Sequence, residues 1–333
     1  MVLKNFKNFS IAILLILFSI PIPILAYSDY VIPGGETIGI ELNTKGVMIV
    51  GVYKVGEIYP ASDAGLKVGD TITKVDGVVV QNIDDMVKKM NTSNGSVTIT
   101  YMRSNQLKDT TLKLYRDEQN VYKTGLYVKD SIVGIGTLSF IDPNTKKYGA
   151  LGHEITEKNT GQILEIKDGH IFESEVTGVE RSEIGTPGEK NAKLYSDQVT
   201  GTVSKNSNQG IFGTYTSDIQ SRKQYKVAQP SEVKLGAAKM LTVLNGTTIE
   251  EYEVNIVNIN KDFSQKTKNI LFEITDQKLL QQTGGVVSGM SGSPIIQDDK
   301  IIAVVTHVVV DNPKRGYGIF ITNMLEEADQ AKG

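Results

Sequence analysis

A long succession of short apolar segments, separated by glycine-rich turns, limits most strongly what this chain can fold into. From about residue 120 onward these segments recur with no helical pattern between them. Short β-branched runs between turns are typical of strands, and many in a row favour a barrel or a sandwich. Near the C-terminus the pattern changes, because Asn323 and Glu326 predict a capped helix start. The expected strands lie at 125–128, 132–140, 161–166, 173–179, 198–203, 254–257 and 269–274.

The bulk composition excludes several classes of protein. A length of 333 residues accommodates about two domains. Apolar content of 40% and charged content of 22% are those of an ordinary globular protein. A net charge of -3 gives no bulk attraction to nucleic acid. The absence of cysteine excludes disulfides and thiolate chemistry, and the sequence has neither a His-Glu-x-x-His pair nor a phosphate-binding glycine loop, so we expect no cofactor.

The N-terminal 26 residues are typical of an export signal. Lys4 and Lys7 give a basic start, residues 11–24 are apolar, and Ala26 supplies a small residue at a plausible cleavage point. An uncleaved membrane anchor is the alternative interpretation. In both cases we expect the remaining chain to work outside the cytoplasm, and we interpret residues 27–35 as a linker.

Residues 36–116 resemble a PDZ domain of the type found in bacterial proteases. The resemblance depends on Ala64-Gly65-Leu66, Gly69-Asp70-x-Ile72 and Asp76-Gly77, with a short amphipathic helix expected at 84–90. It implies that a peptide adds as a strand between residues 38–42 and that helix. The residues expected to bind the peptide or its carboxylate are Gly35, Ile38, Gly39 and Ile40.

The sequence Gly289-Met290-Ser291-Gly292-Ser293-Pro294 precedes a predicted β-hairpin at 295–305. A Gly-x-Ser-Gly loop suits a nucleophilic serine, since glycine lets backbone amides converge on one point where an oxyanion could be held. Turns also use glycine and serine for purely structural reasons. The amides of Gly289 and Ser291 are the candidate oxyanion donors.

A nucleophilic serine needs a base, and the chain has only three histidines. His153 follows a small, glycine-bounded turn at 149–152 and is the best candidate. His170 follows a polar turn, and His307 lies in the strand after the hairpin, where it would line a specificity pocket or pack in the core. The acid that orients the imidazole cannot be chosen by spacing, because several aspartates lie between base and nucleophile.

Several motifs together resemble the SpoIVB peptidases, the stage IV sporulation serine peptidases. They are Gly152-His153, Thr275-Asp276, 283–285, Gly289 to Ile296, 305–308 and 316–318. The resemblance covers nearly the whole chain, and implies a PDZ domain followed by a chymotrypsin-like β-barrel peptidase at 120–333. It also implies a triad of His153 as base, Asp276 as orienting acid and Ser291 as nucleophile.

The resemblance implies a role in sporulation signalling. Such a peptidase is exported into the space between the forespore membranes, where it cleaves itself and a membrane-associated regulator of an intramembrane protease. That cut leads to activation of the late mother-cell sigma factor. Two alternatives are a PDZ adaptor with an inactive peptidase domain and a quality-control protease of the HtrA type. The order of the domains argues against the second, because the PDZ motif precedes Ser291.

Overall fold

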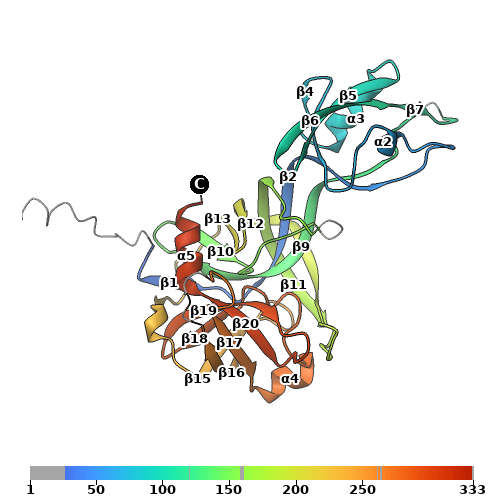
Figure 1. Cartoon of the computed structure of the whole chain (residues 1–333). Helices are drawn as coiled ribbons and strands as arrows, with labels where there is room; N and C mark the ends of the chain where they lie inside the picture. Colours follow the sequence, from blue (N-terminus) through green and yellow to red (C-terminus); the bar gives the residue numbers. More distant parts are fainter. Residues whose placement is uncertain (1–26, 120, 158–160, 261, 263–264, 332–333) are drawn as a thin grey trace, which may run out of the picture.

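The computed structural model describes residues 27–119, 121–157, 161–260, 262 and 265–331. The expected export signal at 1–26 therefore lies outside the described residues. No described helix is both long and apolar enough to cross a membrane. The described chain is mainly β, as the succession of short apolar segments predicts, and it forms two barrels and a PDZ domain (Figure 1).

The first barrel closes through antiparallel pairs in the order β2-β9-β10-β13-β12-β11, with β11 pairing back to β2. Alternate residues of β2, among them Ile38, Ile40 and Leu42, point into its core, as the two-residue period of a strand requires. Its strands are β2 (Thr37–Val52), β9 (Leu126–Ile141), β10 (Lys147–Ala150), β11 (Ile166–Val179), β12 (Lys190–Ser207) and β13 (Gly210–Tyr215).

The second barrel closes in the order β15-β16-β17-β20-β19-β18, with β18 pairing back to β15. The hairpin expected after the serine loop is confirmed, and its turn contains Asp298 and Asp299 at φ +50° and +58°. The strands are β15 (Gly236–Thr242), β16 (Glu250–Ile259), β17 (Ile270–Ile274), β18 (Pro294–Gln297), β19 (Lys300–Val308) and β20 (Arg315–Phe320), and the helix α4 (Gln277–Thr283) follows β17.

The PDZ domain is inserted into the first barrel. The strands β2 and β9 pair along the barrel from Thr37↔Thr137 to Asn43↔Ser131, and then resume pairing in the PDZ domain from Met48↔Lys129. Both connections between the two domains are therefore barrel strands, as Figure 1 shows. The remaining PDZ elements are α2 (Pro60–Asp63), β3 (Thr71–Val75), β4 (Val78–Val79), α3 (Ile83–Asn91), β5 (Ser96–Arg103) and β6 (Gln106–Lys113), followed by the small hairpin of β7 (Tyr115–Arg116) and β8 (Tyr122–Lys123).

The segment expected to be a linker is part of the barrels. Within residues 27–35, β1 (Tyr30–Pro33) pairs with β9 of the first barrel and with β14 (Tyr225–Val227), which in turn pairs with β19 of the second. Val31 and Ile32 are buried at 0% and 1% exposure. Val31 packs in the cluster shared by the two barrels and Ile32 in the core of the first barrel, and this burial stabilises the segment as a strand.

Two short-range motifs hold the PDZ domain. The helix α3 confirms the one expected at 84–90, and Asn82 caps it by accepting the amide of Asp85 at 2.8 Å. Asp70, 1% exposed, accepts the amide of Lys67 at 2.8 Å and both Nε and Nη2 of Arg103 at 2.6 Å. A carboxylate this deeply buried needs such partners, which explains why the Gly-Asp motif occurs where it does.

The C-terminal helix differs from the expected one at its start. The helix α5 (Ile321–Asp329) begins directly after β20 with Phe320 at the N-cap position, so Asn323 lies inside the helix. The Asn323 amide group instead donates to the Lys266 carbonyl and to Asn269 Oδ1, both at 3.1 Å. Burial of Met324 and Leu325 between the two barrels fixes the helix, and this packing outweighs the local capping signal.

Candidate active site

A cavity of about 310 Å³ brings the serine loop and the candidate base together. One wall comes from β2, β9 and the chain after β10 in the first barrel, and the other from the loop before β18 in the second. Its lining includes His153, Glu154, Ser288, Gly289 and Ser291. The two barrels therefore place His153 and Ser291, which are far apart in sequence, in one cleft.

The backbone of the serine loop is built by its glycines. Gly289 and Gly292 have φ angles of +90° and +102°, which L side chains rarely adopt. A Cβ at 292 would also lie 2.0 Å from the carbonyl oxygen of Thr137. The backbone amides of Gly289 and Ser291 donate to no other group among the described residues. They are therefore free to receive an oxyanion, and their role as its donors stays a prediction.

The hydroxyl of Ser291 donates to the carbonyl oxygen of Thr306 at 2.7 Å. Thr306 lies in β19, the strand that follows the serine hairpin. The proton of the hydroxyl is thus directed at a main-chain carbonyl, and it has to be redirected before an imidazole can take it. Catalytic hydrogen bonds commonly form only when substrate is bound.

His153 follows a strained turn in which Leu151 and Gly152 have φ angles of +70° and +73°. Its Nδ1 lies 2.8 Å from the carbonyl oxygen of Glu154. A carbonyl only accepts, so Nδ1 carries the proton and Nε2 keeps its lone pair. This is the tautomer that a general base for serine requires.

Thr137 of β9 connects the two loops, and sequence reasoning did not identify it. Its Oγ1 donates to Gly289 O at 2.6 Å, its amide donates to Ser291 O at 3.1 Å, and its carbonyl accepts the amide of Leu151 at 3.2 Å. This completely buried threonine therefore holds the serine loop and the histidine turn in register. A lone threonine in a strand carries no local signal of such a role.

A buried lysine lies behind the serine loop. Lys190 is 1% exposed, and its Nζ donates to Thr242 Oγ1 at 2.8 Å and to Thr37 Oγ1 at 3.4 Å. Its amide also donates to Ser288 O at 3.0 Å. Within the part of the chain that the structure describes, no carboxylate forms an ion pair with it. Burial lowers the pKa of Lys190 from 10.5 to about 7.

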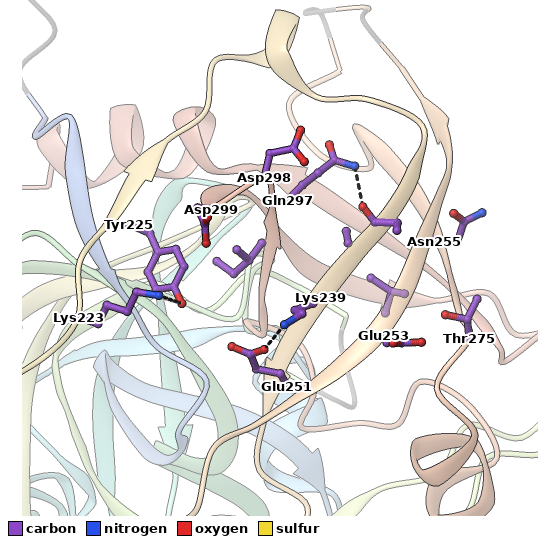
Figure 2. A pocket seen from close by; sticks show the side chains of 14 residues that line it. Lys223, Tyr225, Lys239, Glu251, Glu253, Asn255, Thr275, Gln297, Asp298 and Asp299 are labelled. Atoms are coloured by element: carbon purple, nitrogen blue, oxygen red, sulfur yellow. Dashed lines mark hydrogen bonds and ion pairs between the residues drawn. The ribbon is translucent and has the colours of Figure 1, made fainter.

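Asp276, the expected orienting acid, lies in a different environment. It is the N-cap of α4, where its carboxylate accepts the amides of Leu279 at 2.8 Å and of Glu253 at 3.5 Å. Its neighbours Thr275 and Glu253 line a separate pocket of about 520 Å³ on the second barrel (Figure 2). Among the described residues no hydrogen bond joins Asp276 to His153, so the structure brings together two of the three expected triad members. An orienting role for Asp276 stays a prediction that this geometry does not support.

That separate pocket is charged, and its two lysines have partners within it. Figure 2 shows Lys239 directed at Glu251 and Lys223 directed at Tyr225, with nitrogen–oxygen distances of 2.6 and 2.9 Å. The described residues contain no group of three or more histidine, aspartate or glutamate side chains placed to hold a metal ion.

The residues expected to bind a peptide in the PDZ domain lie instead in the first barrel. Residues 38–42 pair with β9 on one edge and with β11 on the other, which leaves no edge for an added strand. Gly35 donates its amide to Leu138 O at 2.8 Å, and a Cβ on Gly39 would collide with the Phe172 ring. Within the PDZ domain, it is Leu126 to Lys129 of β9 that pair with the second half of β2.

A serine hydroxyl and an imidazole that share one cleft between two closed six-stranded barrels, with a PDZ domain inserted, define a serine peptidase of the chymotrypsin-like type. The family model described as SpoIVB peptidase S55 matches residues 120–325, and a PDZ model matches residues 37–114. The chain belongs to the SpoIVB peptidase S55 family, a family of sporulation serine peptidases. The resemblance inferred from the sequence motifs is thereby confirmed.

Comparison with other proteins adds only distant similarities. No curated protein sequence matches the chain. The PDZ domain of the SdrC-like protein from Listeria monocytogenes is 22% identical, with 26% of this chain and 90% of that chain covered and a TM-score of 0.23. The Rv3671c protease from M. tuberculosis is 14% identical over 61% and 75% of the two chains, with a TM-score of 0.34. Human heparin binding protein is 10% identical over 58% and 83%, with a TM-score of 0.31. Similarities at this level carry no functional weight.

Proposed function

We propose that this chain is the signalling endopeptidase of sporulation, which cleaves itself and a membrane-associated regulator of an intramembrane protease. The cleavage would occur in the space between the forespore membranes, after export directed by residues 1–26, and would lead to activation of the late mother-cell sigma factor. Support comes from the family membership and, above all, from the single cleft that holds Ser291 and His153.

In the proposed reaction, Ser291 Oγ attacks a peptide carbonyl while His153 Nε2 takes its proton. The amides of Gly289 and Ser291 hold the oxyanion of the tetrahedral intermediate. The imidazolium then gives its proton to the leaving amine, and a water molecule activated by the same imidazole hydrolyses the acyl-enzyme. The carbonyl of Glu154, which holds the proton on Nδ1, fixes the tautomer that this sequence of steps needs.

Labelling with a fluorophosphonate tests the site directly. The purified chain should be labelled at Ser291 and should fragment on incubation, whereas Ser291→Ala and His153→Ala should do neither. If the wild-type chain neither labels nor fragments, even with the membrane regulator present, the alternative of a PDZ adaptor with an inactive peptidase domain is favoured.

The role of Asp276 is tested by Asp276→Asn. Asparagine caps helices about as well as aspartate, so α4 should remain intact. If Asp276 orients the imidazole, by contrast, the kcat of the enzyme should fall about 10⁴-fold on this change. The rate at which the fluorophosphonate labels Asp276→Asn reports on a role as orienting acid, and the midpoint of its urea unfolding reports on the role as helix cap.

A further inference from the structure

The second barrel brings another histidine to the catalytic imidazole. The ring centroids of His153 and His307 are 5.1 Å apart, with their planes tilted by 42°. His307 lies in β19, directly after Thr306, whose carbonyl accepts the Ser291 hydroxyl. The same strand therefore contacts the nucleophile through one residue and the base through the next.

The hydrogen bond of His153 holds one nitrogen of its ring, and His307 packs against the ring itself. Its Nδ1 is engaged by the Glu154 carbonyl, and the Asp276 carboxylate is engaged at the start of α4. Among the described residues, the ring contact with His307 is a further support for the imidazole at Ser291. An aromatic ring can stabilise a cation that lies over its face within about 6 Å of its centroid.

We propose that His307 is a positioning residue for the reaction, whose neutral ring packs against His153, holds it toward Ser291 and stabilises the imidazolium that forms when the serine proton is taken. This inference rests on the proposed peptidase function. It gives a role to a histidine for which the sequence offered only a specificity pocket or a core position.

The charge of His307 at working pH agrees with this role. Loss of hydration and the nearby charges of His153 and Lys268 lower the pKa of His307 to about 4, against a smaller opposing effect of Glu154. The His307 side chain is exposed, so water screens part of this effect and the downward direction of the pKa is what matters. His307 is therefore neutral near pH 7, where a second imidazolium beside His153 would oppose catalysis.

Three substitutions at one position separate positioning from substrate binding. His307→Phe keeps a neutral ring, and its kcat on a cleaved peptide should stay within about threefold of wild type. His307→Ala removes the ring, and kcat should fall about tenfold with KM unchanged, because a cation–π contact of about 1–2 kcal/mol corresponds to roughly that factor. His307→Lys should lower kcat further and move the acid limb of the kcat profile to lower pH. His170→Phe, on the outside of the first barrel, is the matched control.

A second measurement does not depend on activity. The chain has only three histidines, so each imidazole Cε1 proton can be followed by NMR in the Ser291→Ala background. In His307→Lys the titration midpoint of the His153 signal should move down by about half to one pH unit, as expected for a charge about 5 Å away. In His170→Phe it should not move.

Two outcomes would overturn the proposal. An unchanged His153 midpoint in His307→Lys would show that the two rings do not face each other in solution. A rise in KM with unchanged kcat in His307→Ala would make His307 a substrate-pocket residue instead. Failure of the wild-type chain to label at Ser291 would instead sink the proposed function, and the NMR result would still decide the ring contact.

Discussion

Replacement of Lys190 by methionine should make the protein more stable at neutral pH. The side chain is 1% exposed and has only hydroxyl partners, and burial lowers its pKa from 10.5 to about 7. At about 1.4 kcal/mol per pKa unit, this shift corresponds to a cost of about 5 kcal/mol to the folded state. Methionine fills a similar volume but loses the hydrogen bonds to Thr242 and Thr37, about 1 kcal/mol each. The net gain expected at pH 7 is about 3 kcal/mol.

The sign of the pH dependence follows from the lowered pKa. Between pH 7 and 10.5 the unfolded chain holds the Lys190 proton and the folded chain does not, so wild-type stability rises with pH in this window. The cost of burying the lysine is complete below pH 7 and has largely gone by pH 10. The advantage of Lys190→Met should therefore shrink as the pH rises, and by pH 10 the lost hydrogen bonds should outweigh it.

Urea unfolding of the Ser291→Ala protein, with and without Lys190→Met, measures this difference at pH 7 and pH 10. Lys193→Met on the same strand is the control, because an exposed lysine should change the free energy of unfolding by less than about 0.5 kcal/mol. If Lys190→Met destabilises the protein equally at both values of pH, the buried amine is charged and well solvated by its partners, and the reasoning fails.

Two further predictions concern the contacts that hold the site and the PDZ domain. Thr137→Val removes the hydrogen bond to the Gly289 carbonyl and should lower kcat about tenfold, because a displaced serine loop misaligns the attack. The control is Ser139→Ala, two residues along β9, which removes a buried hydroxyl that has no hydrogen-bond partner among the described residues and should leave the labelling rate unchanged. Arg103→Met leaves the buried carboxylate of Asp70 without its cation and should cost about 3 kcal/mol, read as loss of amide-exchange protection in the PDZ domain; retained protection would contradict this account.

Local signals in the sequence predicted the elements that depend on nearby residues. The mainly β class, the helix at 84–90 and the hairpin after Ser291 follow from turn residues, end charges and alternation within a few positions. The PDZ domain was expected from the resemblance of its short motifs to a known domain. The cap expected at Asn323 was wrong, because the side chain is used to hold Asn269 across the core and packing starts the helix at Ile321.

Long-range pairing could not be predicted in the same way. The strand at 38–42 has the composition of a PDZ strand, but its partners lie about residue 135 and residue 170, and no local pattern selects them. The polar sequence Asn43-Thr44-Lys45-Gly46, where the pairing of β2 is interrupted, is the one available sign of a boundary. In the site, the motifs identified the cleft residues Ser291 and His153, whereas Thr137 and the proximity of His307 emerge only from the packing of the barrels.

The two shared strands decide how this protein can be dissected. A truncation that removes everything before residue 117 would take β1 and β2 away and open the first barrel beside the catalytic cleft. A PDZ-free enzyme has to be made by internal excision, with Asn43 joined to Ser131 through a tight turn, since the strand register already places them opposite each other. Because β9 belongs to both domains, a force applied to the PDZ domain would be transmitted along β9 to Thr137. Thr137 is hydrogen-bonded to the loop that carries Ser291, so the PDZ domain is mechanically connected to the catalytic site.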